Sequence, residues 1–249
     1  MPSEHKIALI GCGNMGEKFA EKLNANFYFY DNDFDKANNL QKKGLGKACS
    51  TFEEAIDSAD LVILAIKPQN LKEFHVDIKD RTLISILAGT PLSKLKKHII
   101  AKHTIRLMPN LAILHGKGAI AVVSDKKEAK LEQLLSPLGK LFWLKESEIN
   151  AFTAISSSGI AYVFSFIQAM EQAALKLGFS PMQSKAIIEQ TLIGASSLYS
   201  QSDKPLNEWI NEVASKGGTT EAGLKVLDMQ GVTEAFFAAN VKAQELENE

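Results

Sequence analysis

The sequence predicts an α/β amino-terminal domain followed by an all-α carboxyl-terminal domain. In the first half, short apolar runs (IALIG, FYFYD, LVILAI, TLISILA, TIRLM, AIAVV and KLFWL) alternate with polar segments that carry Lys and Glu. Strands that alternate with helices indicate a mostly parallel sheet covered on both faces. From about Glu146 the strand pattern stops and long helical segments follow. We therefore expect one domain over residues 1–145 and a second over residues 146–249.

The composition points to a small-molecule ligand. The 28 basic and 29 acidic residues nearly balance, so no net field favours nucleic acid or an anionic membrane. The first residues, MPSEHK, do not form a secretory signal pattern. The two cysteines and five histidines show no disulfide or metal-ligand spacing. We expect a cytoplasmic protein with no metal, no nucleic acid and no membrane among its partners.

A glycine-rich stretch follows the first strand. The apolar run Lys6–Ile10 leads into GCGNMG, which opens a helical pattern, and a second strand then ends at Asp31. This context makes the GxGxxG pattern a Rossmann-type dinucleotide-binding loop. Gly11 allows the tight turn, Gly13 the close approach of the pyrophosphate, and Gly16 the packing of helix on strand. The predicted cofactor contacts of this loop are Gly11, Gly13, Asn14, Met15 and Gly16.

The residues after the second strand bear on the choice between NADH and NADPH. Asp31 lies where a carboxylate accepts hydrogen bonds from the adenosine ribose. It would repel a 2'-phosphate by roughly 4 kcal/mol at 4 Å and an effective dielectric of 20. Asn32 can donate to such a phosphate, and Lys36 can approach it one helical turn later. Asp31 therefore favours NADH, while Asn32 and Lys36 keep NADPH open.

The stretch LAIKPQ ends another strand, at the edge of the sheet where folds of this class bind their ligands. Ala65, Lys67 and Pro68 are therefore expected beside the cofactor. Lys67 either neutralises a phosphate or is a solvated loop lysine.

Local signals mark several helix ends. Ser50–Glu53 and Thr51–Glu54 both have capping-box spacing. In the second half, Gly178 ends a long helix and Ser180–Pro181 starts the next. Thr233 can cap the last helix, whose acidic end, ELENE, we expect to fray.

The first long helix of the second half is apolar nearly all round between Ile160 and Ile167. A helix with no polar face is normally buried, and about a hundred residues have few ways to surround it. We infer that the protein forms a homodimer through this region, with higher oligomers open. A central core helix within one subunit is the alternative.

Six stretches together resemble the pyrroline-5-carboxylate reductases. GCGNMG, AIKPQ, SILAG, IRLMPN, SSSGIAYVF and ASKGGTTEAG follow in that family's order and at its spacings. The resemblance implies hydride transfer from NADH or NADPH to the C=N bond of 1-pyrroline-5-carboxylate. The product would be L-proline, and the reaction the last step of proline biosynthesis.

The resemblance also assigns roles to the second glycine pair. It places the backbone of Gly217, Gly218 and Thr219 near the substrate carboxylate, and the hydroxyl of Thr220 near the ring nitrogen. A helix amino terminus offers unpaired N–H groups to an anion, and glycine leaves room for its approach. Thr220 is the predicted catalytic residue. We favour positioning over proton donation, because a threonine hydroxyl is a poor general acid.

The resemblance places further residues at the active site. Asn110, in the MPN turn, is implied beside the nicotinamide, and Ser158 and Gly159 at the start of the central helix, facing the cleft. This chain has SSSGIAY where the family often has SGSGPAY, so Ser157 and Ile160 depart from its pattern. Other departures are Asp31, Phe52 and Lys216.

Two alternatives remain. The β-hydroxyacid dehydrogenases share the amino-terminal pattern, but they need a lysine four positions after the second glycine of the central-helix motif. Counting four from Gly159 gives Val163. A non-catalytic dinucleotide-binding regulator would keep the first glycine loop and lose the substrate site, and the intact ASKGGTTEA argues against it.

Overall fold

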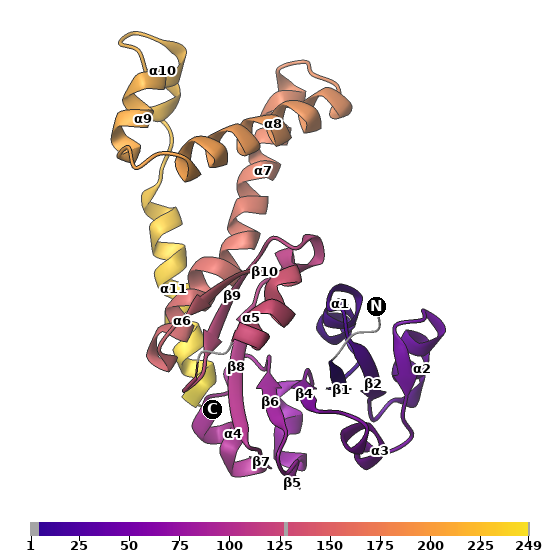
Figure 1. The fold of residues 1–249 in the computed structure, drawn as a ribbon. Helices are drawn as coiled ribbons and strands as arrows, with labels where there is room; N and C mark the ends of the chain where they lie inside the picture. The colour runs from indigo at the N-terminus through magenta and orange to yellow at the C-terminus, as the bar shows by residue number, and fades with distance from the viewer. Residues whose placement is uncertain (1–4, 127–128, 249) are drawn as a thin grey trace. The chain divides into compact units, whose positions relative to one another are not determined.

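The computed structural model describes residues 5–126 and 129–248, and they form two compact units. The first unit comprises the chain up to Ser158 and the closing segment from Ala238, and the second comprises Gly159–Phe237. The first holds the sheet and the second is helical (Figure 1). The predicted α/β and all-helical classes are confirmed. The boundary predicted between residues 145 and 146 stays a prediction.

Eight strands form one sheet in the order β10-β9-β8-β6-β4-β1-β2-β3. Its strands are β1 (Lys6–Ile10), β2 (Asn26–Tyr30), β3 (Gly46–Ala48), β4 (Leu61–Leu64), β6 (Thr82–Ser85), β8 (His103–Pro109), β9 (Gly118–Val123) and β10 (Gly139–Trp143). Neighbours are parallel except β8 and β9. That pair is joined by the 3-10 turn η2 (Leu111–His115), which is too short for a parallel crossover. A separate parallel pair is formed by β5 (Val76–Asp77) and β7 (Ile99–Ile100).

Alternate residues of the central strands enter two different cores. In β1, Ile7 and Leu9 pack with one core, and Ala8 and Ile10 with the other. The first core includes residues of α1 (Asn14–Lys22), α2 (Phe34–Lys42) and α5 (Ala129–Leu135). The second includes residues of α3 (Phe52–Asp57), η1 (Pro68–Glu73) and α4 (Leu92–His98). A strand buried on both faces reads as a continuous apolar run, which is the pattern of IALI.

The start of α3 is capped by side chains that the sequence pattern predicted. The Thr51 hydroxyl accepts a hydrogen bond from the Glu54 backbone N–H at 3.1 Å. The Glu54 carboxylate in turn accepts from the Ser50 N–H at 2.9 Å. Of the two capping boxes that the sequence offered, the Thr51–Glu54 pair supplies the N-cap.

The helical half begins inside the first unit and continues through the second. Its elements are η4 (Glu146–Glu148), α6 (Ile149–Phe152), the π-helical turn η5 (Thr153–Ser158), α7 (Gly159–Lys176), α8 (Pro181–Ser200), α9 (Leu206–Val213), α10 (Thr219–Leu224) and α11 (Gln230–Asn248). Gly178, at φ +94°, follows α7, as expected of a residue that ends a helix. Ser180 and Gln183 form a reciprocal capping box at the start of α8, so this predicted start is confirmed.

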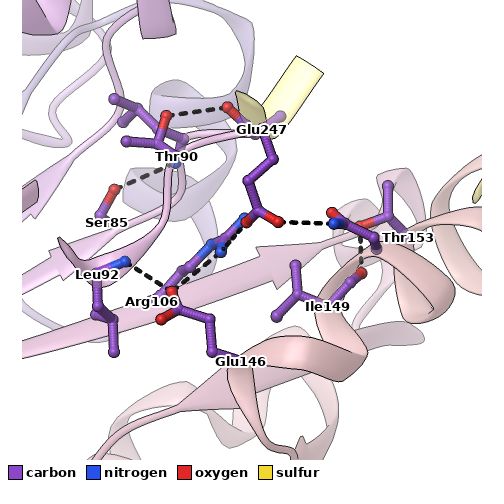
Figure 2. Close-up of polar contacts among 11 residues, drawn as sticks. Ser85, Thr90, Leu92, Arg106, Glu146, Ile149, Thr153 and Glu247 are labelled. Atoms are coloured by element: carbon purple, nitrogen blue, oxygen red, sulfur yellow. Dashed lines mark hydrogen bonds and ion pairs between the residues drawn. The ribbon is translucent and has the colours of Figure 1, made fainter. Parts of the chain in front are cut away.

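Two expectations about the last helix are wrong. Thr233 is not its N-cap, because α11 begins at Gln230 and Thr233 lies within the helix, where its hydroxyl donates to the Met229 carbonyl one turn earlier. The Asp228 carboxylate instead accepts from the Gln230 N–H at 2.9 Å. Up to Asn248 the acidic end does not fray, since α11 extends to that residue and Glu247 pairs with a buried arginine of the sheet (Figure 2); Glu249 lies outside the described residues.

The helical unit buries little of its own apolar surface. Within Gly159–Phe237, as the structure describes it, Ile188 is the one large apolar side chain that is buried. Many others are exposed, among them Val163, Phe164, Phe166, Leu198, Tyr199, Val226 and Phe237. The alternative of a core helix within one subunit therefore does not hold for α7. By length and composition alone, Glu146–Lys176 could also cross a membrane, but one such helix is weak evidence for a membrane span.

Candidate cofactor and substrate sites

A cavity of about 370 Å³ lies at the carboxyl ends of β1, β2 and β4. Six predicted cofactor residues line it: Gly11, Gly13, Asp31, Asn32, Ala65 and Lys67. Parallel strands of this fold class bind their ligands at this edge. The cavity thus gathers residues from three separate stretches of the chain, as the sequence predicts.

Backbone geometry explains two glycines of the first loop. Gly11 has φ +99°, and a Cβ there would lie 2.6 Å from the carbonyl of Ala65. A Cβ on Gly16 would lie 2.2 Å from the Gly11 oxygen. At Gly13 a Cβ would meet no atom within 4 Å, so the bare backbone there faces open space. This is the geometry that a closely approaching pyrophosphate requires.

Asn14, Met15 and Gly16 open α1, directly after the loop. Met15 packs against the core on one face of the sheet. Its contribution to the site is therefore to hold the helix amino terminus in place, where the dipole attracts an anion.

Asp31 organises the loop through both carboxylate oxygens. One accepts a hydrogen bond from the Cys12 N–H at 2.8 Å and the other from the Asp33 N–H at 2.9 Å. An ionised carboxylate has about four acceptor positions, so two remain for ribose hydroxyls. Lys36 also lines the cavity, and its ammonium lies 3.4 Å from the Asp33 carboxylate.

Cys12 is a space-filling residue of the loop. Its side chain is buried, and its thiol lies 3.7 Å from the Tyr30 carbonyl. Burial, followed by the negative charge of Asp31, raises the pKa of the Cys12 thiol to about 12. The thiol therefore stays protonated at neutral pH, which makes it unreactive as a nucleophile.

An aromatic cluster adjoins the cavity. Phe52 packs edge-on against Tyr30 at 5.9 Å between ring centroids, and against Phe74 at 5.8 Å. Tyr30 and Phe74 both line the cavity. Phe52, one of the departures from the family pattern, therefore supports an apolar wall of this cavity.

Lys67 and Pro68 stand where the chain leaves β4. Lys67 is exposed at the mouth of the cavity, and Pro68 begins η1. Pro68 lines a neighbouring cavity of about 340 Å³ together with Gln69, Ala88 and Gly89. This second cavity extends the candidate cofactor site along the ends of β4 and β6.

Asn110 is a buried anchor at the end of β8. Its Nδ2 donates to the Ser156 carbonyl at 3.0 Å, and its Oδ1 accepts from the Ala112 and Ala119 N–H groups. The residue is 5 % exposed. The amide thus fixes the MPN turn to the π-helical turn and to β9, which sequence reasoning, expecting a direct cofactor contact, did not foresee.

The π-helical turn brings the serine-rich stretch to the same place. The Ser157 hydroxyl lies 3.4 Å from the Pro109 carbonyl. Ser158 ends this turn half-buried, and Gly159 is the buried first residue of α7. The Ser156 hydroxyl oxygen is buried without a hydrogen-bond partner in the part of the chain that the structure describes. Such an atom is suited to a ligand or water contact, and the sequence carried no signal for it.

The second glycine pair, Gly217 and Gly218, directly precedes α10. Gly217 has φ +76°, Gly218 is the N-cap, and α10 begins at Thr219. The Gly217 N–H donates to the Glu221 carboxylate at 2.7 Å, and the Gly218 N–H to the Ser215 carbonyl at 3.0 Å. Within the helix, the N–H groups of its first turn have no intrahelical acceptor. Those of Thr219 and Thr220 are therefore the donors best suited to an anion.

Glu221 was missed by the sequence reasoning. It stands at the third helical position after the Gly218 cap and reaches back to the backbone, as the acidic residue of a capping box does. The spacing of Glu221 three residues after Gly218 in GGTTE was the available signal.

Thr220 lines an apolar groove of about 300 Å³ between α8, α9 and α10. Its other walls include Tyr199, Trp209 and Leu224. Thr220 is half-buried there, whereas Thr219 is exposed. Burial of one face restricts the rotamers of Thr220, so its hydroxyl is held by packing as well as by the helix.

Two family models match separate parts of the chain. Residues 146–249 match the model described as pyrroline-5-carboxylate reductase dimerisation. Residues 6–89 match the model described as NADP oxidoreductase, coenzyme F420-dependent.

Comparison with known proteins gives likenesses over nearly the whole chain. The pyrroline-5-carboxylate reductase of Aquifex aeolicus is 34% identical over 97% of each chain. The crystal structure of the corresponding enzyme from Streptococcus pyogenes superposes with a TM-score of 0.87, at 26% identity, over 98% of this chain and 99% of that one. The Plasmodium falciparum pyrroline carboxylate reductase, solved with NADP bound, gives a TM-score of 0.84 at 26% identity, over 98% of each.

Proposed function

The chain belongs to the pyrroline-5-carboxylate reductase family, and from this premise we propose how its residues perform the family's reaction. It is an NAD(P)H-dependent oxidoreductase that reduces 1-pyrroline-5-carboxylate to L-proline. The observation that carries the proposal is the pair of glycine-capped helix starts, one at the dinucleotide cavity and one at α10. Each is suited to a different anion, the first to a pyrophosphate and the second to a carboxylate.

The first glycine loop fits a dinucleotide. Gly13 leaves open space for the pyrophosphate, and Asp31 stands at the end of β2 with acceptor positions for the ribose. When bound, the reduced nicotinamide supplies the hydride. Asn110 and the π-helical turn shape the wall beside which we place the nicotinamide ring.

The second loop holds the imine. The N–H groups of Thr219 and Thr220 bind the substrate carboxylate, while Gly217 and Gly218 give the backbone its left-handed turn and its close approach. The Thr220 hydroxyl accepts a hydrogen bond from the protonated ring nitrogen. That proton stays on nitrogen when hydride reaches C5, so imine, proton and NAD(P)H become proline and NAD(P)⁺. Alignment of the two rings is thus the protein's main contribution to rate. Ser158 and Gly159 complete the proposed site.

The test is a steady-state assay of the purified chain with pyrroline-5-carboxylate and each reduced cofactor. We expect imine-dependent oxidation of the nicotinamide. A 3-hydroxyacid with the oxidised cofactor should give no turnover, because Val163 stands where a β-hydroxyacid dehydrogenase needs its lysine. If the protein binds the dinucleotide but shows turnover with neither substrate, it is a regulator.

The choice of cofactor has its own test at Asp31. Asp31→Ser removes the charge that would face a 2'-phosphate, and should raise the ratio of kcat/KM with NADPH to that with NADH by about tenfold or more, equivalent to about 1.4 kcal/mol. The matched control is Asp35→Ser, which removes a charge in the first turn of α2, outside the residues that line the cavity. An equal ratio in the Asp31 variant and the control would show that Asp31 does not face the ribose.

The exposed apolar surface of the helical unit supports self-association. The match to a dimerisation model agrees with an oligomer, and we propose a homodimer formed by α7, α8 and α11. Sedimentation velocity of the purified chain should give at least twice the monomer mass of 27.2 kDa. A monomer at micromolar concentration would refute this arrangement.

We propose the cytoplasm as the compartment. Both cysteines are buried free thiols, which fits a reducing environment. Among the described residues, no group of three or more potential metal ligands occurs.

A further inference from the structure

The largest fully buried side chain among the described residues is that of Arg106, which is 1 % exposed. It lies on β8, four residues before Asn110. A buried guanidinium costs several kcal/mol unless it is paired. Its Nη1 donates to the Glu247 carboxylate at 2.7 Å and to the Glu146 carboxylate at 3.1 Å (Figure 2).

The two carboxylates extend this network to other elements. Glu146 Oε1 also accepts from the Leu92 N–H at the start of α4, at 2.6 Å. Glu247 Oε2 accepts from Asn150 Nδ2 at 2.7 Å. We refer to Arg106, Glu146, Asn150 and Glu247 as the clasp. It joins four segments of the first unit, namely β8, the start of α4, η4–α6 and the end of α11.

The clasp residues lie in the first unit, near the two places where the chain passes between the units. The chain leaves the first unit after Ser158 and returns to it at Ala238. Glu146 and Asn150 precede the departure by about three and about two helical turns, and Glu247 follows the return. Beside Glu247, the backbone of Leu246 packs on Gly89, where an added Cβ would lie 3.1 Å from the Leu246 oxygen. The end of α11 is therefore held on the sheet by an ion pair and by close packing.

We propose that Arg106 is a positioning residue of the reductase. Through Glu146 and Glu247 it holds the segments that lead into and out of the helical unit on β8, the strand that ends at Pro109, next to Asn110, and so controls hydride transfer. This inference rests on the proposed function. Hydride transfer depends steeply on geometry, because a misplacement of about 1 Å can lower a rate by about 100-fold.

Glu247→Gln is the variant of choice. The amide oxygen of the new Gln side chain still accepts from Arg106, but its NH2 group faces the Asn150 Nδ2 group, which is also a donor, so that hydrogen bond is lost. Arg106 retains its ion pair with Glu146, and the protein should therefore fold. In single-turnover stopped-flow experiments, we expect the rate constant for hydride transfer to fall at least tenfold. The dissociation constant of the reduced dinucleotide should change by less than about twofold. Glu245→Gln is the control, because Glu245 lies on the same helix in an exposed ion pair with Lys242.

A second substitution tests the geometry of the clasp. In the double variant Asn150→Asp, Glu247→Gln, the Gln amide becomes the donor and the Asp carboxylate the acceptor. The exchange restores both the hydrogen bond between the two positions and the total charge. We expect the double variant to recover most of the hydride-transfer rate. A chain that ends at Glu245 lacks Glu247 altogether, and should show the same loss as the single variant.

The outcomes separate positioning from stability. All rates are measured well below the melting temperature of the weakest variant. A lowered melting temperature with the wild-type hydride-transfer rate would make the clasp purely structural and overturn the proposal, as would failure of the exchange to restore the rate. A wild-type chain that does not reduce the imine at all would instead refute the proposed function.

Discussion

Gly13→Ala should leave the fold intact and weaken dinucleotide binding by about 10- to 100-fold. Gly13 has φ −76° and ψ −174°, which any L-residue adopts, and a Cβ there meets no protein atom within 4 Å. The methyl group would instead occupy the space proposed for the pyrophosphate. Loss of one hydrogen bond to a charged group corresponds to about 1.5–3 kcal/mol, which gives this range.

Gly16→Ala should act differently, although the residue is three positions away. Its Cβ would lie 2.2 Å from the Gly11 oxygen, and that oxygen belongs to a turn held by the Gly11 N–H bond to Tyr30. Overpacking of this kind costs about 1–3 kcal/mol of folding stability. We expect a lower melting temperature together with lost binding.

Thermal unfolding and dinucleotide titration of the two variants distinguish the mechanisms. Gly13→Ala should unfold within a few degrees of the wild type. If it binds the dinucleotide as tightly as the wild type does, the pyrophosphate does not pass this loop. If Gly16→Ala unfolds at the wild-type temperature, the close packing of α1 on the turn is not what requires glycine.

The fold class could be predicted from the sequence because strands and helices each leave a local, repeated pattern of apolar residues. The seven apolar runs became β1, β2, β4, β6, β8, β9 and β10. The strands that it did not predict, β3, β5 and β7, are two or three residues long. Segments that short carry no periodicity, and their pairing is decided by the neighbours that the fold brings to them.

The candidate site was predictable where a motif fixes the backbone. Gly11 and Gly16 are explained by contacts within the loop and with the next strand end. Asn110 was identified as a site residue, but its buried bond to the Ser156 carbonyl joins segments that lie 46 residues apart in sequence. No local pattern reports such bonds.

The acidic end of the chain shows the same limit. As a sequence, ELENE reads as a solvated, fraying terminus. Glu247 instead lies on the sheet, where it pairs with Arg106, 141 residues earlier in the chain. The buried charge of Arg106 requires acidic partners, and Glu247 and Glu146 supply them. The sequence pattern that could have indicated this pairing is the lone arginine in the strand TIRLM. A charged side chain within a buried strand requires a partner of opposite charge.

Thr220→Val should lower kcat/KM for the imine by about 10- to 100-fold, with the affinity for the dinucleotide nearly unchanged. Valine preserves the shape of the side chain in the groove beside Trp209 and removes only the hydroxyl that we place at the ring nitrogen. A hydrogen bond to a charged group contributes about 1.5–3 kcal/mol, which is the range given. Steady-state kinetics with varied imine, and a separate titration with the dinucleotide, measure the two effects.

Thr220→Ser is the matched control, because it keeps a hydroxyl at the same position of α10. It should retain activity within a few-fold of the wild type, and Thr220→Ala should behave like the valine variant. The dependence on pH then distinguishes positioning from proton donation. If Thr220 only positions the protonated imine, the valine variant loses the same factor at every pH. A loss that grows as pH rises would instead mean that the hydroxyl helps to deliver the proton, since at high pH less imine is protonated in advance. Wild-type kinetics in the valine variant at all pH values would remove Thr220 from the reaction and leave its role as the start of a helix.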